Sequence, residues 1–341
     1  MIDFYNFCRS AGLILDGVVA DGKWRRCATE DHPRKKNGTY KLAEHGGIGY
    51  CQNFAVHSEP LVWKPYRRND QPIPHIDRAK IAARMAEDKR KQIRATREAR
   101  EFYDTCKPLI GSHPYLQGHG LDMAGCYGLR VDALGWLVIP MMIGESLMSV
   151  QRIANNGEKL FWPGAPSKNT VYWIERKGAS VTVVCEGLAT GLAIFASMPM
   201  ARVVCAFTSG NMRNIALPAG GMVAVAGDWD VGTVCQRHKA EGLKTAFEPF
   251  SEKADWCLCN PGRKAATELA DALGCGAAFP IGAAGTDWCD HRNERLSTLM
   301  TERQKAREGD LRRAVDAEIC AAIMRRAKFV RNVVDKTAPV K

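Results

Sequence analysis

Three acidic residues follow two short apolar stretches, at the points where buried strands would end. Glu186 comes after Val181–Cys185, and Asp228 and Asp230 come after Met222–Ala226. If the two strands are neighbours, their ends lie about 5 Å apart and the three carboxylates converge. Converging carboxylates repel one another unless a divalent cation lies between them, and hard oxygen ligands favour Mg²⁺ or Mn²⁺. The pattern therefore predicts a metal site that supports phosphoryl or nucleotidyl transfer.

A second acidic pair, Asp287 and Asp290, follows a strand-like stretch at residues 277–282. Two interpretations of this pair stay open. The two aspartates can hold a second metal ion or the metal of a bound triphosphate. They can equally cap the helix that we expect to begin near Arg292, because aspartate is a favoured N-cap residue.

The elements that must position these residues alternate between strands and helices from about residue 108 onward. Continuous apolar strands that alternate with helices indicate a parallel sheet covered on both faces. In such sheets the functional groups lie beyond the carboxyl ends of the strands. The expected strands are residues 134–139, 149–153, 181–185, 203–207 and 222–226, and the expected helices are about 189–197, 232–249 and 262–273.

The first 66 residues have a different residue pattern, in which turn-forming Gly, Asn and Asp separate short strand-like runs. Aromatic residues are spread through them, and basic residues cluster at 23–26 and 34–36. A β-rich module of this kind suits single-stranded nucleic acid, because bases stack on aromatic rings while cations follow the phosphates. The alternative is that the aromatic residues form the core of a small domain.

Prolines mark a linker at about 60–74, and a charged segment follows from Asp77 to about Lys107. That segment lacks Pro and Gly and is rich in helix formers, so we expect a mostly solvated helix that bridges two domains. From about Arg292 the chain is again basic and helix-forming. An apolar stripe in this tail packs on the domain or on a partner, and its residues are Leu311, Val315, Ile319, Ile323 and Ala327.

The chain has 341 residues, 25% of them charged, and a net charge of +11. This basic balance favours an anionic partner such as nucleic acid, although a well-solvated basic surface would give the same numbers. The sequence shows no secretory signal and no apolar run of ~18 residues that could span a membrane, which favours a cytoplasmic protein without a membrane partner. The thirteen cysteines include no CxxC pair, so we expect thiols and no zinc site.

The sequences around the acidic residues resemble the Toprim domain of bacterial-type DNA primases from phages and plasmids. The matching stretches are CEGLATGLAIF, SGNM, VAGDWD, NPGRKAATELADALG and GTDWCD, within residues 110–291. The resemblance implies that Glu186, Asp228 and Asp230 are catalytic and hold Mg²⁺ or Mn²⁺. It also places Asp287 and Asp290 in a late D-x-x-D motif that contributes to the metal site.

The preceding segment, which includes LMSVQRIANNGEKLFWPG, resembles the subdomain before Toprim in the same primases. There, Arg152 and Lys159 fall in a pattern whose basic residues contact template or nucleotide phosphates. Without the resemblance they would be surface cations on a hairpin. Arg130, Lys168 and Asn211 are predicted as further nucleic-acid or nucleotide contacts, and Asn211 lies where the family often has a Ser-Gly-Asn loop.

Four departures from the family pattern stand out. His119 stands where relatives often carry a basic residue, and the chain lacks the N-terminal zinc ribbon that many relatives have. The link after the DxD pair, from Val231 to about Trp256, is longer than usual, and there is no GxxxxGK[ST] helicase loop. Template choice therefore has to work differently here or require a partner.

The resemblance implies an α/β fold built around a Toprim-type parallel sheet flanked by helices. Its parts are a β-rich N-terminal module (1–66), a linker and charged helix (67–107), an α+β primase subdomain (108–178), the Toprim catalytic domain (179–291) and a basic helical tail (292–341). It further implies a DNA primase that makes short RNA primers from ribonucleoside triphosphates on single-stranded DNA, in the cytoplasm of a bacterial host cell, with a replicative helicase as a further partner. Two alternatives stay open: a Toprim metal-dependent nuclease, and a non-catalytic replication protein that binds single-stranded DNA.

Overall fold

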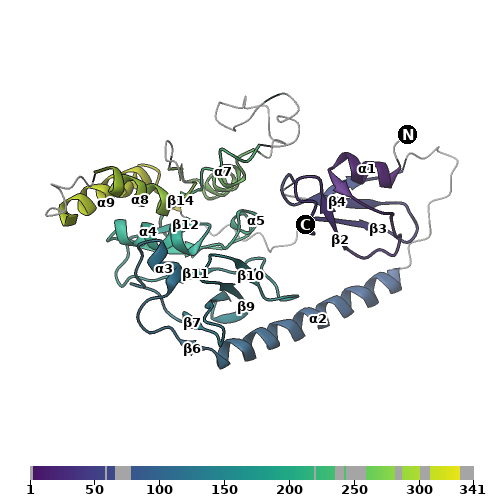
Figure 1. Ribbon diagram of the computed structural model, residues 1–341, viewed down its shortest axis with the longest axis horizontal. Helices are drawn as coiled ribbons and strands as arrows, with labels where there is room; N and C mark the ends of the chain where they lie inside the picture. Colours follow the sequence, from purple (N-terminus) through teal and green to yellow (C-terminus); the bar gives the residue numbers. More distant parts are fainter. Residues whose placement is uncertain are drawn as a thin grey trace. The chain divides into compact units, whose positions relative to one another are not determined.

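The computed structural model describes residues 3–57, 60–65, 78–218, 220–234, 242, 259–280, 286–299 and 308–330. These residues form a mixed α/β protein with eight helices and three sheets (Figure 1). The chain divides into two compact units, one of residues 1–86 and 232–259 and the other of residues 87–231 and 260–341. Residues 66–74 of the expected linker at about 60–74, most of the expected helix at 232–249, and Gly285 lie outside the described residues.

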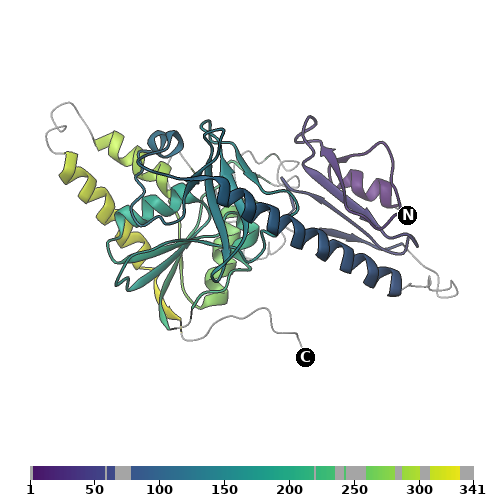
Figure 2. The ribbon, with the colours of Figure 1, turned by 90° about the horizontal axis from the view of Figure 1, so that it is seen from below.

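The first unit contains a five-stranded antiparallel sheet with helix α1 (Phe4–Ser10) on one face (Figure 2). The strands follow one another in sequence order: β1 (Leu13–Ile14), β2 (Arg25–Thr29), β3 (Gly38–Leu42), β4 (Gly49–Asn53) and β5 (Leu61–Trp63). Phe4 and Cys8 of α1 are buried with Tyr40 and Cys51, which are paired across β3 and β4. Because side chains alternate along a strand, the residues next to that pair point to the opposite face.

A single long helix, α2 (Arg78–Thr105), connects this sheet to the next part of the chain. Most of its described side chains are exposed, as expected for a solvated helix, but Ala95 and Ala99 are buried. Arg130 fixes its end, because the guanidinium donates to the carbonyl groups of Tyr103, Asp104 and Cys106. The last carbonyls of a helix have no partner within it, so this side chain supplies donors where they are needed.

A second antiparallel sheet precedes the central sheet in the sequence. Its order is β10 (Lys159–Phe161), β9 (Ser146–Ile153), β8 (Leu137–Ile143), β7 (Arg130–Val131) and β6 (Lys107–Pro108), with helix α3 (Pro114–Gly118) between β6 and β7 in the chain. The sequence placed a strand at 134–139, but β8 begins later. The carboxylate of Asp132 accepts the N–H groups of Leu134 and Trp136, which folds those residues into a turn.

The central sheet has six strands, of which four are parallel. The parallel strands are β13 (Ala201–Cys205), β12 (Val181–Cys185), β14 (Gly221–Ala226) and β15 (Ala277–Ala278), in that order. Strand β11 (Tyr172–Ile174) joins β13 in the antiparallel direction, and β16 (Lys328–Val330) joins β14 in the same way. The sheet is therefore mixed, with a parallel centre, rather than wholly parallel as expected.

Helices cover both faces of this sheet. Successive side chains of its strands point to opposite faces, and both sets are apolar and buried. Val183 belongs to a core shared with α4 (Leu188–Ser197) and α9 (Glu308–Met324), whereas Val184 belongs to a core shared with α7 (Pro261–Leu273). Figure 1 shows α8 (Trp288–Leu299) gathered with α4 and α9. The short helix α5 (Ser209–Met212) packs against α7.

The apolar stripe of the C-terminal tail packs on the central part of the second unit. Val315, Ile319 and Ile323 of α9 are almost fully buried in the same core as α4. The helix expected to begin near Arg292 is α8, which begins four residues earlier, at Trp288. None of the helices in the described residues combines the length and the apolar character needed to cross a bilayer.

Candidate metal centre

The strands that carry the three acidic residues are direct neighbours. β12 and β14 run parallel, with Val183 opposite Ala224 and Val184 opposite Val225. Glu186 follows the end of β12, and Asp228 and Asp230 follow the end of β14. The sheet thus brings Glu186 and the DxD pair to the same edge, as the sequence predicted from the assumption that the strands pair.

The segment that follows β13 holds Glu186 through two backbone N–H groups. The backbone N–H of Ser209, at the start of α5, donates to its carboxylate, and its own carbonyl accepts the N–H of Phe207 at 2.7 Å. Burial, and after it the charges of Asp230 and Asp287, raise the pKa of Glu186 to about 7 against the opposing effects of the Ser209 N–H and Lys159. This carboxyl group is therefore near its protonation midpoint at neutral pH when no cation is bound.

Asp228 carries a buried oxygen atom without a partner. Its Oδ1 accepts no hydrogen bond within the described part of the chain. Burial raises the pKa of Asp228 well above its ordinary value, and the nearby charges of Glu186, Asp287 and Asp230 raise it further. A buried carboxylate oxygen that lacks a donor is costly unless a cation or a proton satisfies it.

Asp230 is fixed by the start of α7. Its Oδ2 accepts the N–H of Gly262 at 2.9 Å, and its own N–H donates to Oδ1 of Asn260 at 2.8 Å. Asn260 is the N-cap of α7, and it stands in the left-handed region with φ of 50°. Burial raises the pKa of Asp230, against the opposing effect of the Gly262 N–H. The helix start thus orients the second aspartate of the DxD pair.

Gly262 makes this close approach possible. A Cβ atom at this position would lie 2.7 Å from Oδ2 of Asp230 and 2.9 Å from Cβ of Asp228. Neither Gly262 nor Asn260 was predicted as a site residue from the sequence. The signal was present in the stretch NPGRKAA, because Asn, Pro and Gly mark a tight helix start, but the partner residue lies 30 positions away in the chain.

Asp287 caps helix α8, as one of the two interpretations of this residue predicted. Its Oδ1 accepts the N–H groups of Cys289 and Asp290, both at 2.8 Å, so it caps α8. Its Oδ2 accepts the hydroxyl of Thr190 at 3.1 Å. At the same time its charge contributes to the raised pKa values of Glu186, Asp228 and Asp230. Asp287 therefore belongs to the acidic cluster while it starts the helix, and Thr190 is a further residue that the sequence did not indicate.

Asp290 is placed differently. Its Oδ2 accepts the N–H of Thr286 at 3.2 Å, one turn before it in the chain. The structure thus gives Asp290 a local hydrogen bond at the start of α8. The charges of Glu186, Asp287 and Asp230 all raise the pKa of Asp228.

The carboxylates suit a divalent cation that keeps much of its water. Among the described residues, no three Asp, Glu, His or Cys side chains are gathered closely enough to hold a metal by themselves. Mg²⁺ does not need such a cage, because it commonly binds one or two carboxylates together with waters and substrate phosphates. The unpartnered oxygen of Asp228 and the mutual charge repulsion of the cluster are the features that a cation would relieve.

Lys159, one of the basic residues predicted to contact phosphates, acts on the acidic residues at the strand ends. The positive charge of Lys159, on β10, lowers the pKa values of both Glu186 and Asp228. Its Nζ lies 6.0 Å from the centre of the Tyr115 ring.

Arg152 is enclosed by aromatic rings instead. Its guanidinium carbon lies 5.4 Å from the ring centre of Trp136, 5.6 Å from that of Phe102 and 5.8 Å from that of Trp162. Asp132 lies 3.9 Å from the same guanidinium group. These contacts give Arg152 a packing role within the second sheet.

The remaining predicted contacts are also separate from the acidic cluster. Arg130 ends helix α2, as described above, and Lys168 is exposed in the segment between β10 and β11. Asn211 is buried, and its amide nitrogen donates to the carbonyl groups of Thr170 and Ala206. Its Oδ1 accepts the N–H of Asn169 at 2.7 Å. Asn211 thus ties α5 to the segment before β11, with both amide hydrogens in use.

The first unit carries a separate surface of aromatic and basic residues on the sheet face opposite α1. Lys41 pairs with Tyr50 across β3 and β4, and Tyr50 pairs with Val62 of β5. The ring of Trp24 lies 6.0 Å from that of Tyr50, and Nζ of Lys41 lies 5.8 Å from the Trp24 ring. Trp24 is 49% exposed, so its ring can accept a further stacking partner.

The chain is similar to two proteins of Escherichia coli, each described as DNA primase TraC. The first is 27% identical over 306 residues, which cover 83% of this chain and 26% of that protein. The second is 26% identical over 309 residues, which cover 82% of this chain and 19% of that protein. The chain thus spans about a quarter or less of the length of these two proteins. No protein-family model matches the chain, and no solved structure matches it.

Proposed function

We propose that this chain is the catalytic part of a DNA primase, with a Toprim-type domain that joins ribonucleotides into short RNA primers on single-stranded DNA. The similarity to the two primases supports the reaction class. The single observation that carries the site is the buried, unpartnered oxygen of Asp228 among carboxylates at the ends of neighbouring parallel strands. Because the chain spans only 26% and 19% of these relatives, the full activity, the substrates and the partners are part of the proposal.

Each residue of the centre has a distinct task in this proposal. Glu186, Asp228 and Asp230 would hold Mg²⁺ or Mn²⁺, with Asp287 contributing negative charge from the start of α8. The bound ion would neutralise phosphate charge and orient the attacking oxygen. The N–H groups of Ser209 and Gly262 keep Glu186 and Asp230 in place. Lys159 would attract the nucleotide phosphates, because it is a cation beside the acidic cluster.

The template and further partners follow from other features. The exposed face with Trp24, Lys41 and Tyr50 is proposed to bind the single-stranded template, because bases stack on aromatic rings and cations follow the phosphates. The net charge of +11 supports a polyanionic partner. A replicative helicase as partner and the cytoplasm of a bacterial cell as location belong to the same proposal.

The decisive experiment is template-dependent synthesis by the full chain. Single-stranded DNA, four ribonucleotides and Mg²⁺ or Mn²⁺ are incubated with wild type, Asp228→Ala and Glu186→Ala. Glu145→Ala is the matched control, because Glu145 is an exposed carboxylate in the turn between β8 and β9. We expect short RNA from wild type and the control, and none from the two site variants.

Other results would change the assignment. Metal-dependent degradation of the DNA without synthesis would point to a Toprim nuclease that uses the same carboxylates. Undiminished RNA synthesis by Glu186→Ala would remove that residue from the catalytic centre. Salt-sensitive binding of DNA with neither activity would favour a non-catalytic replication protein.

A further inference from the structure

One face of the second sheet carries a polar residue among apolar ones. On β9 and β10, Gln151 pairs with Phe161, and Ile153 pairs with Lys159. Residues that pair directly across two strands share a face, as do residues two apart on one strand, so all four side chains lie on the same face. Ile153 belongs to the core that also contains side chains of β12 and α4, and Phe161 packs against that core. This face therefore lies against the central part of the second unit.

Two interactions place this face beside the metal centre. The positive charge of Lys159 lowers the pKa values of Glu186 and Asp228. The ring of Phe161 lies edge-on to that of Phe207, with 6.5 Å between the ring centres. Phe207 in turn donates its backbone N–H to the carbonyl of Glu186. Lys159 and Phe161 therefore both lie at the edge of the central sheet that carries the carboxylates.

The amide of Gln151 has no hydrogen-bond partner in the described part of the chain. The residue as a whole is only 4% exposed, which is unusual for an unpaired amide. Its amide oxygen and nitrogen nevertheless keep contact with solvent, in contrast to the enclosed Oδ1 of Asp228. A side-chain amide offers two donor hydrogens and an acceptor oxygen. A small ligand at the metal centre can therefore reach a polar group that can both donate and accept.

A cation, a ring and this amide lie within reach of one small molecule. Lys159 precedes Phe161 by two residues, so their backbones lie about 6.6 Å apart along the strand. Gln151 stands directly opposite Phe161, where Cβ atoms are about 4.5–5.5 Å apart. Lys159 is exposed and the Phe161 side chain is only partly buried. A ligand whose phosphate lies at Lys159 can thus place the group next to that phosphate on the ring and beside the amide.

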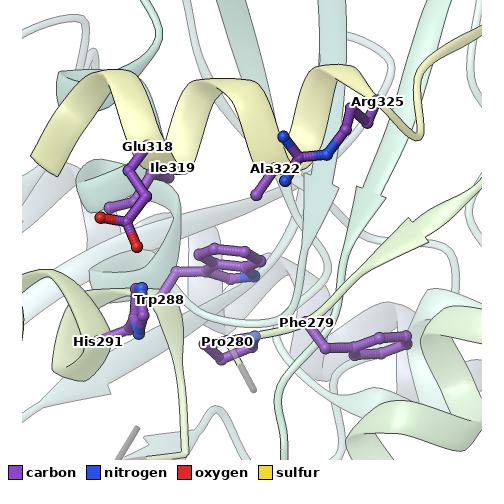
Figure 3. Close-up of a pocket in the computed structure, with 8 residues that line it drawn as sticks. All are labelled: Phe279, Pro280, Trp288, His291, Glu318, Ile319, Ala322 and Arg325. Atoms are coloured by element: carbon purple, nitrogen blue, oxygen red, sulfur yellow. The ribbon is translucent and has the colours of Figure 1, made fainter. Parts of the chain in front are cut away.

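The pocket between β15, α8 and α9 offers no comparable set of groups (Figure 3). Trp288 and Ile319 in its lining are only 2% and 1% exposed, so they present almost no surface to a ligand. Of these two places in the described residues, the face with Gln151 is the one where a nucleotide can meet polar groups.

The group next to the phosphates of a nucleotide is its sugar. A ribose 2′-hydroxyl both donates and accepts, which matches the two functions of an amide. A glutamine that read the base would favour adenine, because its amide pairs with two atoms of that base. An enzyme that copies any template has to accept all four bases. The ribose is common to all four ribonucleotides, so it is the part that a fixed amide can recognise.

We propose that Gln151 recognises the ribose 2′-hydroxyl of a ribonucleoside triphosphate, with the phosphates toward Lys159 and the Phe161 ring against the sugar. With a deoxyribose in the same place, the amide has no partner and the interaction is lost. Gln151 is therefore the residue that makes the site prefer ribonucleotides to deoxyribonucleotides. The assignment rests on the proposed function, since it takes the triphosphate of the primase reaction as the ligand.

Equilibrium binding by the full chain tests this preference without any synthesis. ATP, 2′-deoxy-ATP and 3′-deoxy-ATP are titrated calorimetrically with Mg²⁺ and without DNA, beside inorganic tripolyphosphate, which has no sugar. We expect wild type to bind ATP and 3′-deoxy-ATP alike, and 2′-deoxy-ATP at least tenfold more weakly. Tripolyphosphate reports on the phosphate contacts alone.

Gln151→Leu removes the amide and keeps a side chain of similar size on an otherwise apolar face, so it should fold. We expect this variant to bind ATP only as tightly as 2′-deoxy-ATP, with the affinity for tripolyphosphate unchanged. Gln92→Leu is the matched control, because Gln92 is exposed on α2, and it should keep the full preference for ATP. Phe161→Ala should weaken ATP and 2′-deoxy-ATP by the same factor and leave tripolyphosphate unchanged.

Other outcomes overturn the assignment. Equal binding of ATP and 2′-deoxy-ATP by wild type, or an unchanged preference in Gln151→Leu, would remove Gln151 from sugar recognition and leave the proposed primase function standing. A parallel loss of tripolyphosphate binding in Gln151→Leu would show a general disturbance of the site instead of a lost sugar contact. Wild type that binds neither the triphosphates nor tripolyphosphate would overturn the nucleotide site at the metal centre, and both proposals with it.

Discussion

At the scale of single residues, the protonation of Glu186 makes the free energy of unfolding of the metal-free protein depend on pH. The pKa of Glu186 is about 7 in the folded chain and 4.5 in its ordinary state, so between these values the folded protein binds a proton that the unfolded chain does not. The free energy of unfolding of the metal-free protein therefore falls as pH rises from about 4.5 to 7, and the raised pKa of Asp228 acts in the same direction.

The corresponding prediction concerns Glu186→Gln in EDTA. This variant cannot ionise, so we expect it to be more stable than wild type at pH 8 and about equally stable at pH 5. Urea unfolding of both proteins at several pH values provides the measurement. A wild-type stability that rises with pH across this window, without metal, would contradict the argument.

The sequence predicted the residues that act through their position in the chain and missed those that act through a distant partner. Glu186, Asp228 and Asp230 were identified because each directly follows an apolar strand. Thr190 and Asn260 were not, because Thr190 bonds to Asp287 and Asn260 to Asp230, across 97 and 30 positions. For Arg152 the sequence motif predicted a phosphate contact, but only the fold shows that aromatic rings such as that of Trp136 surround its guanidinium group.

At the scale of elements, the start of α7 determines the shape of the metal centre. Gly262→Ala would place a Cβ 2.7–3.0 Å from atoms of Asp228 and Asp230, including the backbone carbonyl oxygen of Asp228. Since that carbonyl cannot move freely, we expect a loss of about 1–3 kcal/mol in the free energy of unfolding, and weaker Mn²⁺ binding.

Gly309→Ala is the matched control for this substitution. Gly309 lies in α9, where an added Cβ meets nothing closer than 3.7 Å, and alanine is the better helix former. We expect this variant to be as stable as wild type or more so, with unchanged Mn²⁺ affinity. Chemical unfolding and Mn²⁺ titration would be measured on both variants, and equal behaviour of the two would refute the steric argument.

Two substitutions of Asn260, the N-cap of α7, should differ in their effect on the free energy of unfolding but weaken metal binding alike. Asn260→Ala removes the cap and also strains the left-handed backbone, so we expect a loss of about 1–2 kcal/mol. Asn260→Gly removes the same cap but tolerates the backbone, so the loss should be a few tenths of a kcal/mol. Both variants lose the acceptor for the Asp230 N–H, and both should bind Mn²⁺ more weakly. Equal destabilisation by Ala and Gly would count against this account of the helix start.

Element types were predicted better than element limits. The strands at 181–185 and 222–226 are mostly apolar, with Thr182 as the one polar residue, and the pattern located them within one residue. The antiparallel strands β11 and β16 are three residues long, too short for any periodic pattern. The strand expected at 134–139 was misplaced because one side chain, Asp132, turns the backbone there. A local hydrogen bond of this kind leaves no periodic trace in the sequence.

At the scale of the whole molecule, the proposed template surface can be tested apart from catalysis. Base stacking on an aromatic ring contributes ~1–3 kcal/mol, so Trp24→Ala and Tyr50→Ala should each lower the affinity for single-stranded DNA at least fivefold. Tyr127→Ala is the control, because Tyr127 is 71% exposed in the second unit. Fluorescence anisotropy at several salt concentrations would show both the loss and the salt dependence. If Tyr127→Ala lowers the affinity for single-stranded DNA equally, the sheet face with Trp24 and Tyr50 is not a specific binding surface.

The grouping of distant segments was the least predictable property. The sequence suggested five consecutive parts, whereas the described residues form two compact units, and the first of these units ends within helix α2. The structure also assigns α9 and β16 to the unit that contains the metal centre, through the buried side of the tail helix. Composition and periodicity describe neighbours in the chain, so they identify the stripe on α9 but not the surface that it covers.

Strand β16 has a consequence for how the protein is made. It pairs with Gly221–Val223, the first half of β14, while β15 pairs with the second half. On the ribosome, β16 emerges about a hundred residues after β14, a delay of roughly 5–20 s at ordinary elongation rates. During that time the nascent chain presents an open sheet edge beside the strand that leads to Asp228, and such an edge is prone to intermolecular pairing. Chaperone demand during translation should therefore concentrate on this interval.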